Sequence, residues 1–115
     1  MYTPLNTGRL DKRVTIQARS ESDDGGGGVT ITWANVATVW ASVAPGTGRE
    51  FTAAQQTMPD LSHVVTVRYR TGLTAKHRFV YISRGTTRTF AIHAINDPLE
   101  RHEHLVCFCE EEPAT

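Results

Sequence analysis

Histidines and cysteines are the residues of this sequence that could hold a metal ion or take part in catalysis. His102 and His104 flank Glu103 and would share one face of a strand, but two imidazoles supply only half of the four ligands of a typical zinc site. The other histidines are scattered at turns and on one strand. We therefore expect neither a metal site nor a cofactor. The five histidines are His63, His77, His93, His102 and His104.

The two cysteines, Cys107 and Cys109, are not in a reactive arrangement. Residues two apart in a strand point to the same face, where their sulfurs are poorly placed to bridge one another. Neither cysteine has a positively charged neighbour that would lower the pKa of its thiol. No serine lies in a nucleophile-elbow pattern, and no paired carboxylates lie in a plausible cleft. The sequence therefore predicts small, buried, apolar-like cysteines and no enzymatic activity.

A polar loop at residues 20–28 ends in a run of four glycines. A glycine run can cradle a phosphate, but this one lacks the lysine and the helix that usually follow. Asp23 and Asp24 would also repel an anion. Because ordering four glycines costs much conformational entropy, we expect a mobile loop in the isolated protein.

Length and composition indicate one soluble globular domain. The chain has 115 residues, of which 39% are hydrophobic and 21% are charged. No apolar run approaches the roughly 20 residues of a membrane span, and the first residues lack a signal-peptide hydrophobic region, so we expect no membrane partner and no secretion. We divide the single domain 1–115 into an N-terminal arm (1–11), a barrel (13–110) with a long loop at 46–62, and an acidic tail (111–115).

Alternating apolar and polar residues predict an all-β fold with frequent turns. Six or seven short strands indicate a small antiparallel β-barrel or a tight sandwich, and closure into a barrel would remove exposed edges. We expect the first two strands to form a hairpin, residues 34–38 to make a corner, Trp33 and Trp40 to lie in the core, and Tyr69 to point inward. The predicted strands are 13–19, 29–33, 39–43, 64–70, 78–82, 88–95 and 104–110.

The long loop after the third predicted strand is far longer than a hairpin connection requires. Thr47 and Glu50 stand three apart, as in a capping box, so a helix of about ten residues could begin there and end near Met58. Phe51, Ala54 and Met58 would form an apolar stripe on that helix. The stripe must rest on its own domain, for example as a helix that plugs one end of the barrel, or on a neighbouring subunit.

Charge is segregated along the chain although the net charge is zero. Residues 61–96 contain six basic and no acidic residues, whereas residues 97–115 contain six acidic residues and one arginine. These groups could pair within one chain across adjacent strands, or a basic face could meet the acidic face of the next copy in a head-to-tail ring. The residues predicted to form a subunit or ring interface are Arg68, Arg70, Arg78, Arg84, Glu110 and Glu111.

A second reading of the same basic strands is a small β-barrel that binds nucleic acid. Arg68, Tyr69 and Arg70, with Arg78, Phe79 and Tyr81 on the strand expected beside them, resemble the basic and aromatic surface that binds single strands by stacking. Strand alternation separates Tyr69 from the two arginines beside it. Zero net charge also fits poorly with tight, general DNA binding, since the phosphates of DNA dominate such affinity.

Several motifs in one order resemble the head-tail joining, or head completion ("stopper"), proteins of long-tailed bacteriophages. The likeness runs from about Gly8 to Cys109. The motifs are Gly8-Arg9-Leu10, the glycine-rich loop leading to Thr32-Trp33, Val36-Ala37-Thr38-Val39-Trp40-Ala41-Ser42-Val43, Gly48-Arg49-Glu50-Phe51, Ala53-Ala54-Gln55-Gln56, and His63-Val64-Val65-Thr66-Val67-Arg68-Tyr69-Arg70.

The resemblance implies a structural virion protein of the phage neck. It implies a homo-oligomeric ring, of six or twelve copies, between the portal and adaptor on the head side and a tail completion or terminator protein on the tail side. Double-stranded genome DNA would lie in the central channel without sequence-specific contacts. Another phage neck or tail completion protein is the alternative within this class.

The same resemblance implies that the loop at 46–62 helps to close the DNA channel. A conduit lined with many basic residues would hold phosphates too tightly for DNA to slide. The loop offers only Arg49, which Glu50 and Asp60 offset. We therefore expect a steric gate, with the segregated charges holding subunits and rings together. The predicted gate residues are Thr47, Arg49, Glu50, Phe51, Gln55, Gln56 and Met58.

Overall fold

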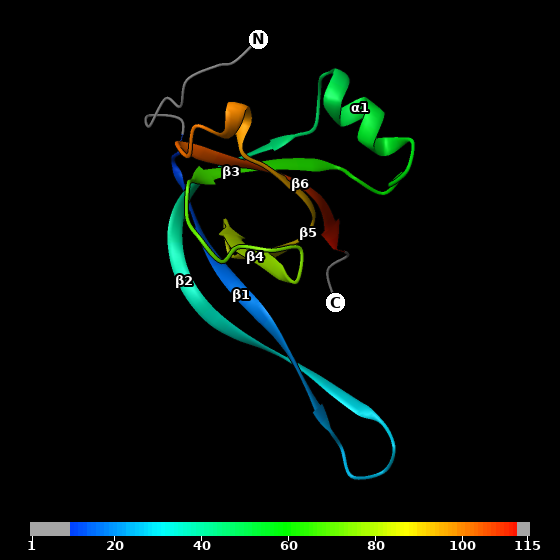
Figure 1. Ribbon diagram of the computed structural model, residues 1–115. Helices are drawn as coiled ribbons and strands as arrows, with labels where there is room; N and C mark the ends of the chain where they lie inside the picture. The colour runs from blue at the N-terminus through cyan, green and yellow to red at the C-terminus, as the bar shows by residue number, and fades with distance from the viewer. Residues whose placement is uncertain (1–9, 113–115) are drawn as a thin grey trace.

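Six antiparallel strands close into a barrel in the computed structural model, which describes residues 10–112 (Figure 1). The strands follow one another around the barrel in the order β1-β2-β3-β6-β5-β4, and β4 pairs again with β1. The predicted all-β barrel with one short helix is confirmed; most of the predicted arm, 1–11, lies outside the described residues. The elements are β1 (Lys12–Asp23), β2 (Val29–Pro45), α1 (Arg49–Gln55), β3 (His63–Arg68), β4 (His77–Ser83), β5 (Thr86–Asn96), η2 (Pro98–Glu100) and β6 (His104–Glu112).

The barrel interior is filled by apolar side chains that all six strands contribute. Phe79 and Phe90 face each other across β4 and β5 and are fully buried. Val14 and Ile16 of β1 are buried in the same cluster. This core follows from the alternation of the strands, which sends every second side chain inward. The remaining buried members of the cluster are Ala41, Val65, Val67, Ile92, Leu105, Cys107 and Cys109.

The corner predicted at 34–38 does not exist, because β2 is one continuous strand of 17 residues. A bulge replaces the corner. Ile16 pairs with Ala37 whereas Gln17 pairs with Asn35, so Val36 is an extra residue in the ladder. A shift of one residue moves every later side chain to the opposite face of a strand. The bulge therefore changes which face of β2 its apolar residues occupy.

Neither tryptophan lies in the core, contrary to the prediction. Beyond the bulge Trp33 is on the outer face, half-buried, with the Arg78 guanidinium carbon 4.0 Å from its ring centre. Trp40 alternates with the fully buried Ala41, so it points outward and is 51% exposed. The Arg13 guanidinium carbon lies 4.8 Å from the Trp40 ring centre. Both indole rings thus make cation–π contacts with arginine side chains on the outside of the barrel.

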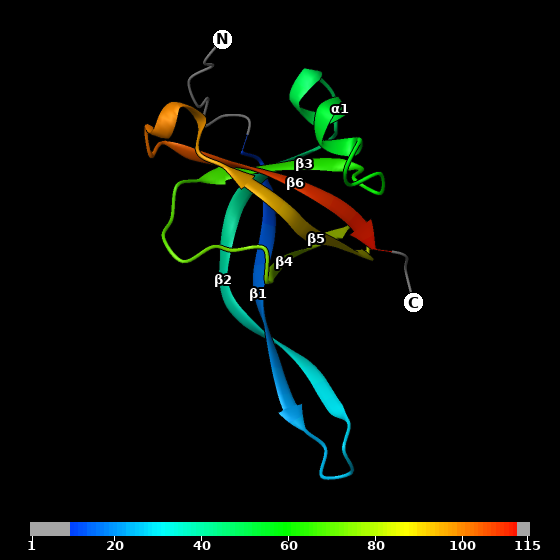
Figure 2. The same ribbon diagram turned by 45° about the vertical axis from the view of Figure 1, so that its right-hand side comes forward.

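The outer half of β1 and β2 projects from the barrel as a twisted two-stranded arm (Figures 1 and 2). The β1–β4 pairing stops at Ala18, beyond which β1 has only β2 as a partner. Every residue from 19 to 32 is exposed. This arm accounts for the elongation of the molecule, whose principal extents are 52 × 30 × 29 Å.

Helix α1 is shorter than predicted and begins differently. It spans seven residues, and Gly48 precedes it with a φ of 98° and no side-chain capping hydrogen bond. The capping box between Thr47 and Glu50 is therefore not formed. Glycine adopts this positive φ without the steric cost that a side chain would bring, so the backbone turn at Gly48 starts the helix.

The helix lies against the outside of the barrel wall rather than plugging an end (Figures 1 and 2). Phe51, Leu61 and Phe108 form a second apolar cluster, separate from the interior core. Ala54 and Met58 pack against it, so the predicted apolar stripe is confirmed and rests on its own domain. The wall beneath consists of outward-facing residues of β3, β5 and β6. As a result β6 is covered on both faces.

Candidate functional site

The loop at 46–62, hereafter the excursion, is fixed to the barrel at several points. The Phe51 ring meets the Phe108 ring edge to face, with 5.5 Å between ring centres. A Cβ built on Gly46 would come within 2.1 Å of the Phe51 ring, so the ring packs directly on this glycine backbone. The two ends of the excursion are joined by a hydrogen bond from Gly46 N–H to the Ser62 carbonyl at 3.0 Å. The excursion is thus a folded element with a closed base.

The seven predicted gate residues divide into two groups. Phe51, Gln55 and Met58 face the barrel: Phe51 is 3% exposed, and the Gln55 amide donates to the Leu61 carbonyl at 2.9 Å. The outward group is exposed and carries one positive and one negative charge. Its members are Thr47, Arg49, Glu50 and Gln56. A gating role stays a prediction, and this outward group is the part of the set that could contact something outside the subunit.

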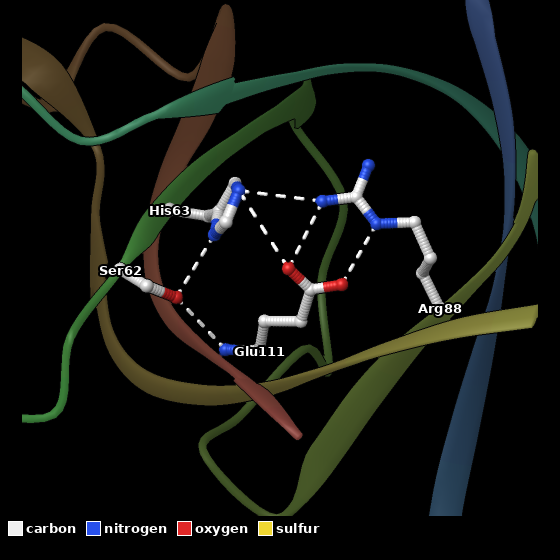
Figure 3. Close-up of polar contacts among 4 residues, drawn as sticks. All are labelled: Ser62, His63, Arg88 and Glu111. Atoms are coloured by element: carbon white, nitrogen blue, oxygen red, sulfur yellow. Dashed lines mark hydrogen bonds and ion pairs between the residues drawn. The ribbon is translucent and has the colours of Figure 1, made fainter. Parts of the chain in front are cut away.

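A polar cluster lies at the base of the excursion and joins three strands (Figure 3). Arg88 of β5 donates from Nε to Glu111 Oε2 at 2.7 Å and from Nη2 to Glu111 Oε1 at 3.0 Å, a two-point ion pair. The Glu111 backbone N–H donates to Ser62 Oγ at 2.9 Å, and Ser62 Oγ is 2.8 Å from His63 Nδ1. These contacts hold the rejoining point of the excursion to β5 and β6.

The hydrogen bonds of His63 indicate a neutral ring with the proton on Nδ1. Arg88 Nη2, which can only donate, lies 3.4 Å from His63 Nε2, so Nε2 accepts and Nδ1 donates to Ser62 Oγ. Burial lowers the pKa of His63, the nearby Glu111 carboxylate opposes that shift, and the Arg88 charge adds to it. The cluster is therefore arranged around an uncharged imidazole at neutral pH.

The Arg88–Glu111 pair accounts for the charge of the cluster. The hydrogen bond from Arg88 is the main cause that lowers the pKa of the Glu111 carboxyl. Burial opposes this shift, the Arg88 charge adds to it, and His63 adds to it when its ring is protonated. Ser62 Oγ already accepts two hydrogen bonds, and both Glu111 oxygens are held by Arg88. We call these four residues, Ser62, His63, Arg88 and Glu111, the clamp, because their contacts hold the end of the excursion to β5 and β6. The sequence analysis did not assign Ser62, His63 and Arg88 to a site. These residues are far apart in the sequence and come together with Glu111 only because β6 pairs with both β3 and β5.

The acidic end of the chain is paired with the same molecule. The Glu110 carboxylate lies 3.0 Å from His93 Nε2, and Arg78 Nη1 lies 4.0 Å from Glu112 Oε2. Glu111 and Glu112, the first two residues of the acidic tail predicted at 111–115, belong to β6, and residues 113–115 lie outside the described residues. Of the two arrangements considered for the segregated charges, the structure shows pairing within one chain for Arg78, Glu110 and Glu111.

Arg68 and Arg70 line a depression that we call the arginine pocket, of about 280 Å³. Tyr69 follows the end of β3 and is 37% exposed, contrary to the predicted inward position, with its ring centre 4.6 Å from that of His102. No described residue forms an ion pair with Arg13, Arg68 or Arg70. The pocket is lined by Arg13, Thr38, Val39, Trp40, Arg68, Tyr69 and Arg70.

Arg84, the remaining predicted interface residue, lies elsewhere. It occupies the turn between β4 and β5 with a φ of 52° and lines a second depression of about 580 Å³ together with Lys12 and Arg88. The structure therefore brings Arg68 and Arg70 together but separates them from Arg84. It also places Arg13 and Trp40, which the sequence analysis did not assign to any site, beside the first two arginines.

The cysteines are buried, as predicted. Burial raises the pKa of the Cys107 thiol to about 12 and raises that of Cys109 as well. Within residues 10–112, no three His, Cys, Asp or Glu side chains are grouped to hold a metal ion. Over the same residues, none of the helices has the length and apolar character needed to cross a membrane.

Comparisons with known proteins identify the family. The phage head completion protein family model matches residues 5–112. The solution structure of protein SF1141 from Shigella flexneri 2a is 26% identical, with a TM-score of 0.74 over 96% of this chain and 100% of that one. A chain from the virion of a native gene transfer agent particle shares the fold at 22% identity, with a TM-score of 0.57 over 90% of this chain and 96% of that one. A search of curated proteins found no match. The chain belongs to the phage head completion protein family and is a structural component of the virion.

Proposed function

We propose that this protein forms a homo-oligomeric ring in the phage neck, where it joins the DNA-filled head to the tail. The observation that carries the proposal is the family match over residues 5–112, which include the whole described barrel. A ring of six or twelve copies would sit between the portal or adaptor and a tail completion protein. A closed barrel suits this role because its strands leave no free sheet edge within the barrel itself, so that free edges are confined to the β1–β2 arm.

The excursion is proposed as the part of the subunit that narrows the DNA channel. Its outward side chains include Arg49 and Glu50, whose charges cancel, together with uncharged Thr47 and Gln56. Such a surface would occupy space without holding phosphates, so genome DNA could slide past it in the absence of sequence-specific contacts. The packing of Phe51 supports a fixed obstruction rather than a flexible finger.

The test is complementation of a phage that lacks this protein. Without it we expect filled heads and separate tails; the wild-type chain restores joined particles, whereas joining at wild-type efficiency without the chain contradicts the proposal. A chain lacking residues 52–57 is the test of gating. We expect it to enter the particle and to leak DNA from tailless heads, while DNA retention in those heads would refute the gate.

The arginine pocket favours one second candidate, a nucleic-acid-binding barrel. Exposed Trp40 and Tyr69 beside three arginines have the chemistry that binds single strands by stacking and phosphate contacts. This candidate predicts that the purified chain binds oligonucleotides, with an affinity that falls steeply as salt increases. Absence of binding at low salt eliminates it.

A further inference from the structure

The tip of the β1–β2 arm is both acidic and apolar. Asp23 pairs with Val29, and Glu21 pairs with Ile31, so each carboxylate lies opposite an apolar side chain on one face. Val29 and Ile31 are 61% and 48% exposed. Glu21 has an ion pair with Arg19 at 2.8 Å, whereas Asp23 and Asp24 have none with a described residue. An exposed apolar face bordered by carboxylates is the chemistry of an interaction surface.

The loop geometry of the tip leaves these carboxylates available. Asp24 Oδ1 accepts from the backbone N–H groups of Gly26 and Gly28, and Asp23 Oδ1 accepts from that of Gly25. These bonds use one oxygen of each carboxylate. The second oxygen of each is not engaged by any described hydrogen-bond donor. Two negative charges are therefore held in place beside Val29.

The arginine pocket has the complementary chemistry. Arg13, Arg68 and Arg70 line it with no acidic side chain among them, and guanidinium groups bind carboxylates with well-defined geometry. The exposed rings of Trp40 and Tyr69 supply apolar walls. A volume of about 280 Å³ admits a few side chains of a turn.

The tip cannot reach the pocket of its own molecule. The pocket residue Arg13 lies at the barrel end of β1, and Asp23 is the last residue of that strand. At a rise of about 3.3 Å per residue the two are separated by about 33 Å along β1. Figure 1 shows the tip at the far end of the arm from the end of β3 that carries Arg68. Contact between tip and pocket must therefore join two molecules.

We propose that the arm tip of one copy docks in the arginine pocket of the next copy. Asp23 and Asp24 approach Arg68 and Arg70, while Val29 and Ile31 pack on Trp40 and Tyr69. Because the two surfaces differ, repetition of this heterologous contact closes a ring when the rotation between copies allows it. The contact rests on the proposed function, in that it names the subunit interface of that ring.

A second copy fits the pocket better than duplex nucleic acid does. The phosphate backbone would satisfy the arginines but would offer nothing apolar to the exposed indole and phenol. A duplex keeps its bases stacked inside, away from Trp40 and Tyr69. The tip supplies carboxylates and apolar side chains together, and the net charge of zero places no electrostatic penalty on association between copies.

Disulfide trapping between two purified full-length chains tests the contact. Gly26 suits a tip cysteine, because a Cβ there would lie 3.5 Å from its nearest heavy atom. Thr38 is an exposed residue of the pocket. We expect a mixture of Gly26→Cys and Thr38→Cys chains to give a cross-linked heterodimer under mild oxidation. Gly26→Cys mixed with Ile82→Cys is the control, since Ile82 is 67% exposed on β4, outside the pocket. Equal yields in the two mixtures overturn the proposal.

Charge variants identify the partner of the pocket. Asp23→Asn/Asp24→Asn removes the charges but keeps the oxygens that accept from the tip amides, so the turn is retained. We expect it to lower the cross-link yield at least tenfold when combined with Gly26→Cys, and Arg68→Glu/Arg70→Glu to do the same when combined with Thr38→Cys. If only the arginine variant has an effect and the wild-type chain binds oligonucleotides, the pocket binds nucleic acid and the docking contact is refuted.

The outcomes separate this contact from the proposed function. A phage that joins heads to tails without this protein refutes the neck role and leaves the cross-link between purified copies standing. Loss of joining in that phage, together with equal cross-linking of the tip–pocket and control mixtures, refutes the docking contact alone.

Discussion

The excursion and the β1–β2 arm are the two segments that leave the barrel, and they are stabilised in opposite ways. The excursion carries its own apolar cluster, a closed base and a polar clamp beneath it. The arm has no core on either face, and every residue from 19 to 32 is exposed. The excursion, which is mostly not strand, is thus packed against the barrel, whereas the regular strands of the β1–β2 arm extend away from it. The length of a loop therefore does not show whether it projects from a domain. What decides this is whether its side chains pack against the domain.

Phe51→Ala should have the largest effect on this comparison. The ring fills the cluster between α1 and the barrel wall, and removing a buried phenylalanine typically costs about 3–5 kcal/mol. We expect a loss of that order in the free energy of unfolding, measured by urea denaturation. Val29→Ala on the arm is the matched control and should change it by less than about 0.5 kcal/mol. Equal small effects would show that the excursion is not fixed to the barrel.

Substitution of one glycine in each segment by alanine tests the same difference between the excursion and the arm. At Gly46 a Cβ would come within 2.1 Å of the Phe51 ring, so Gly46→Ala must displace the ring. Overpacking of this kind costs about 1–3 kcal/mol. At Gly26 the nearest heavy atom would be 3.5 Å away, and Gly26→Ala should leave the urea midpoint unchanged or slightly raised. An unchanged midpoint for Gly46→Ala would contradict the packing of Phe51 described above.

Two ion pairs allow a double-mutant comparison. Arg88 and Glu111 are each 31% exposed and share two hydrogen bonds, whereas Arg19 and Glu21 on the arm are 42% and 54% exposed. We expect a coupling energy of about 1–2 kcal/mol for the first pair. The exposed pair should give about 0.5 kcal/mol or less. Couplings of the same size in the two cycles would mean that the clamp does not stabilise the base of the excursion.

The clamp also predicts a small pH dependence of stability. Because the pKa of His63 is lowered in the folded protein, the unfolded chain binds a proton more readily as pH falls below the ordinary value of 6.5. This contribution is complete above pH 6.5 and is lost as pH falls through the folded pKa. The lowered pKa of Glu111 adds a second loss below pH 4.5. In His63→Gln, the decline in the free energy of unfolding that starts near pH 6.5 should be smaller than in the wild type. If urea denaturation gives the same pH dependence for both proteins, His63 does not contribute to the clamp.

The barrel could be predicted from the sequence because alternation within each strand is a local signal. The inward face of a strand can be read from its own residues, as with Val14 and Ile16 in β1 and with Val65 and Val67 in β3. The bulge at Val36 could not be predicted, since it is defined by the partner strand, and it placed Trp33 outside. The helix start depended on the φ of Gly48 rather than on the Thr47–Glu50 pattern. The spacing of Phe51 and Ala54 did predict which side of α1 is buried, and Met58, beyond the end of the helix, packs against the same cluster.

The surfaces to which we propose a function could be predicted from the sequence only in part. Arg68 and Arg70 lie on one short segment and were identified by their charge. Arg13 and Trp40 join them only through the pairing of β1 with β2 and the position of β3. The Ser62–His63–Arg88–Glu111 cluster likewise depends on three pairings between distant residues. Sites assembled from different strands require the register, which the sequence alone does not specify.

Electron cryo-microscopy of the assembled neck tests the account most directly, because it shows both projecting segments among their neighbours. We predict a ring in which residues 23–31 of each subunit contact Arg68, Arg70 and Trp40 of the next, while Thr47, Arg49 and Gln56 face the DNA channel. A ring with the arm tips free of any neighbouring subunit and the excursion buried between subunits would contradict the account.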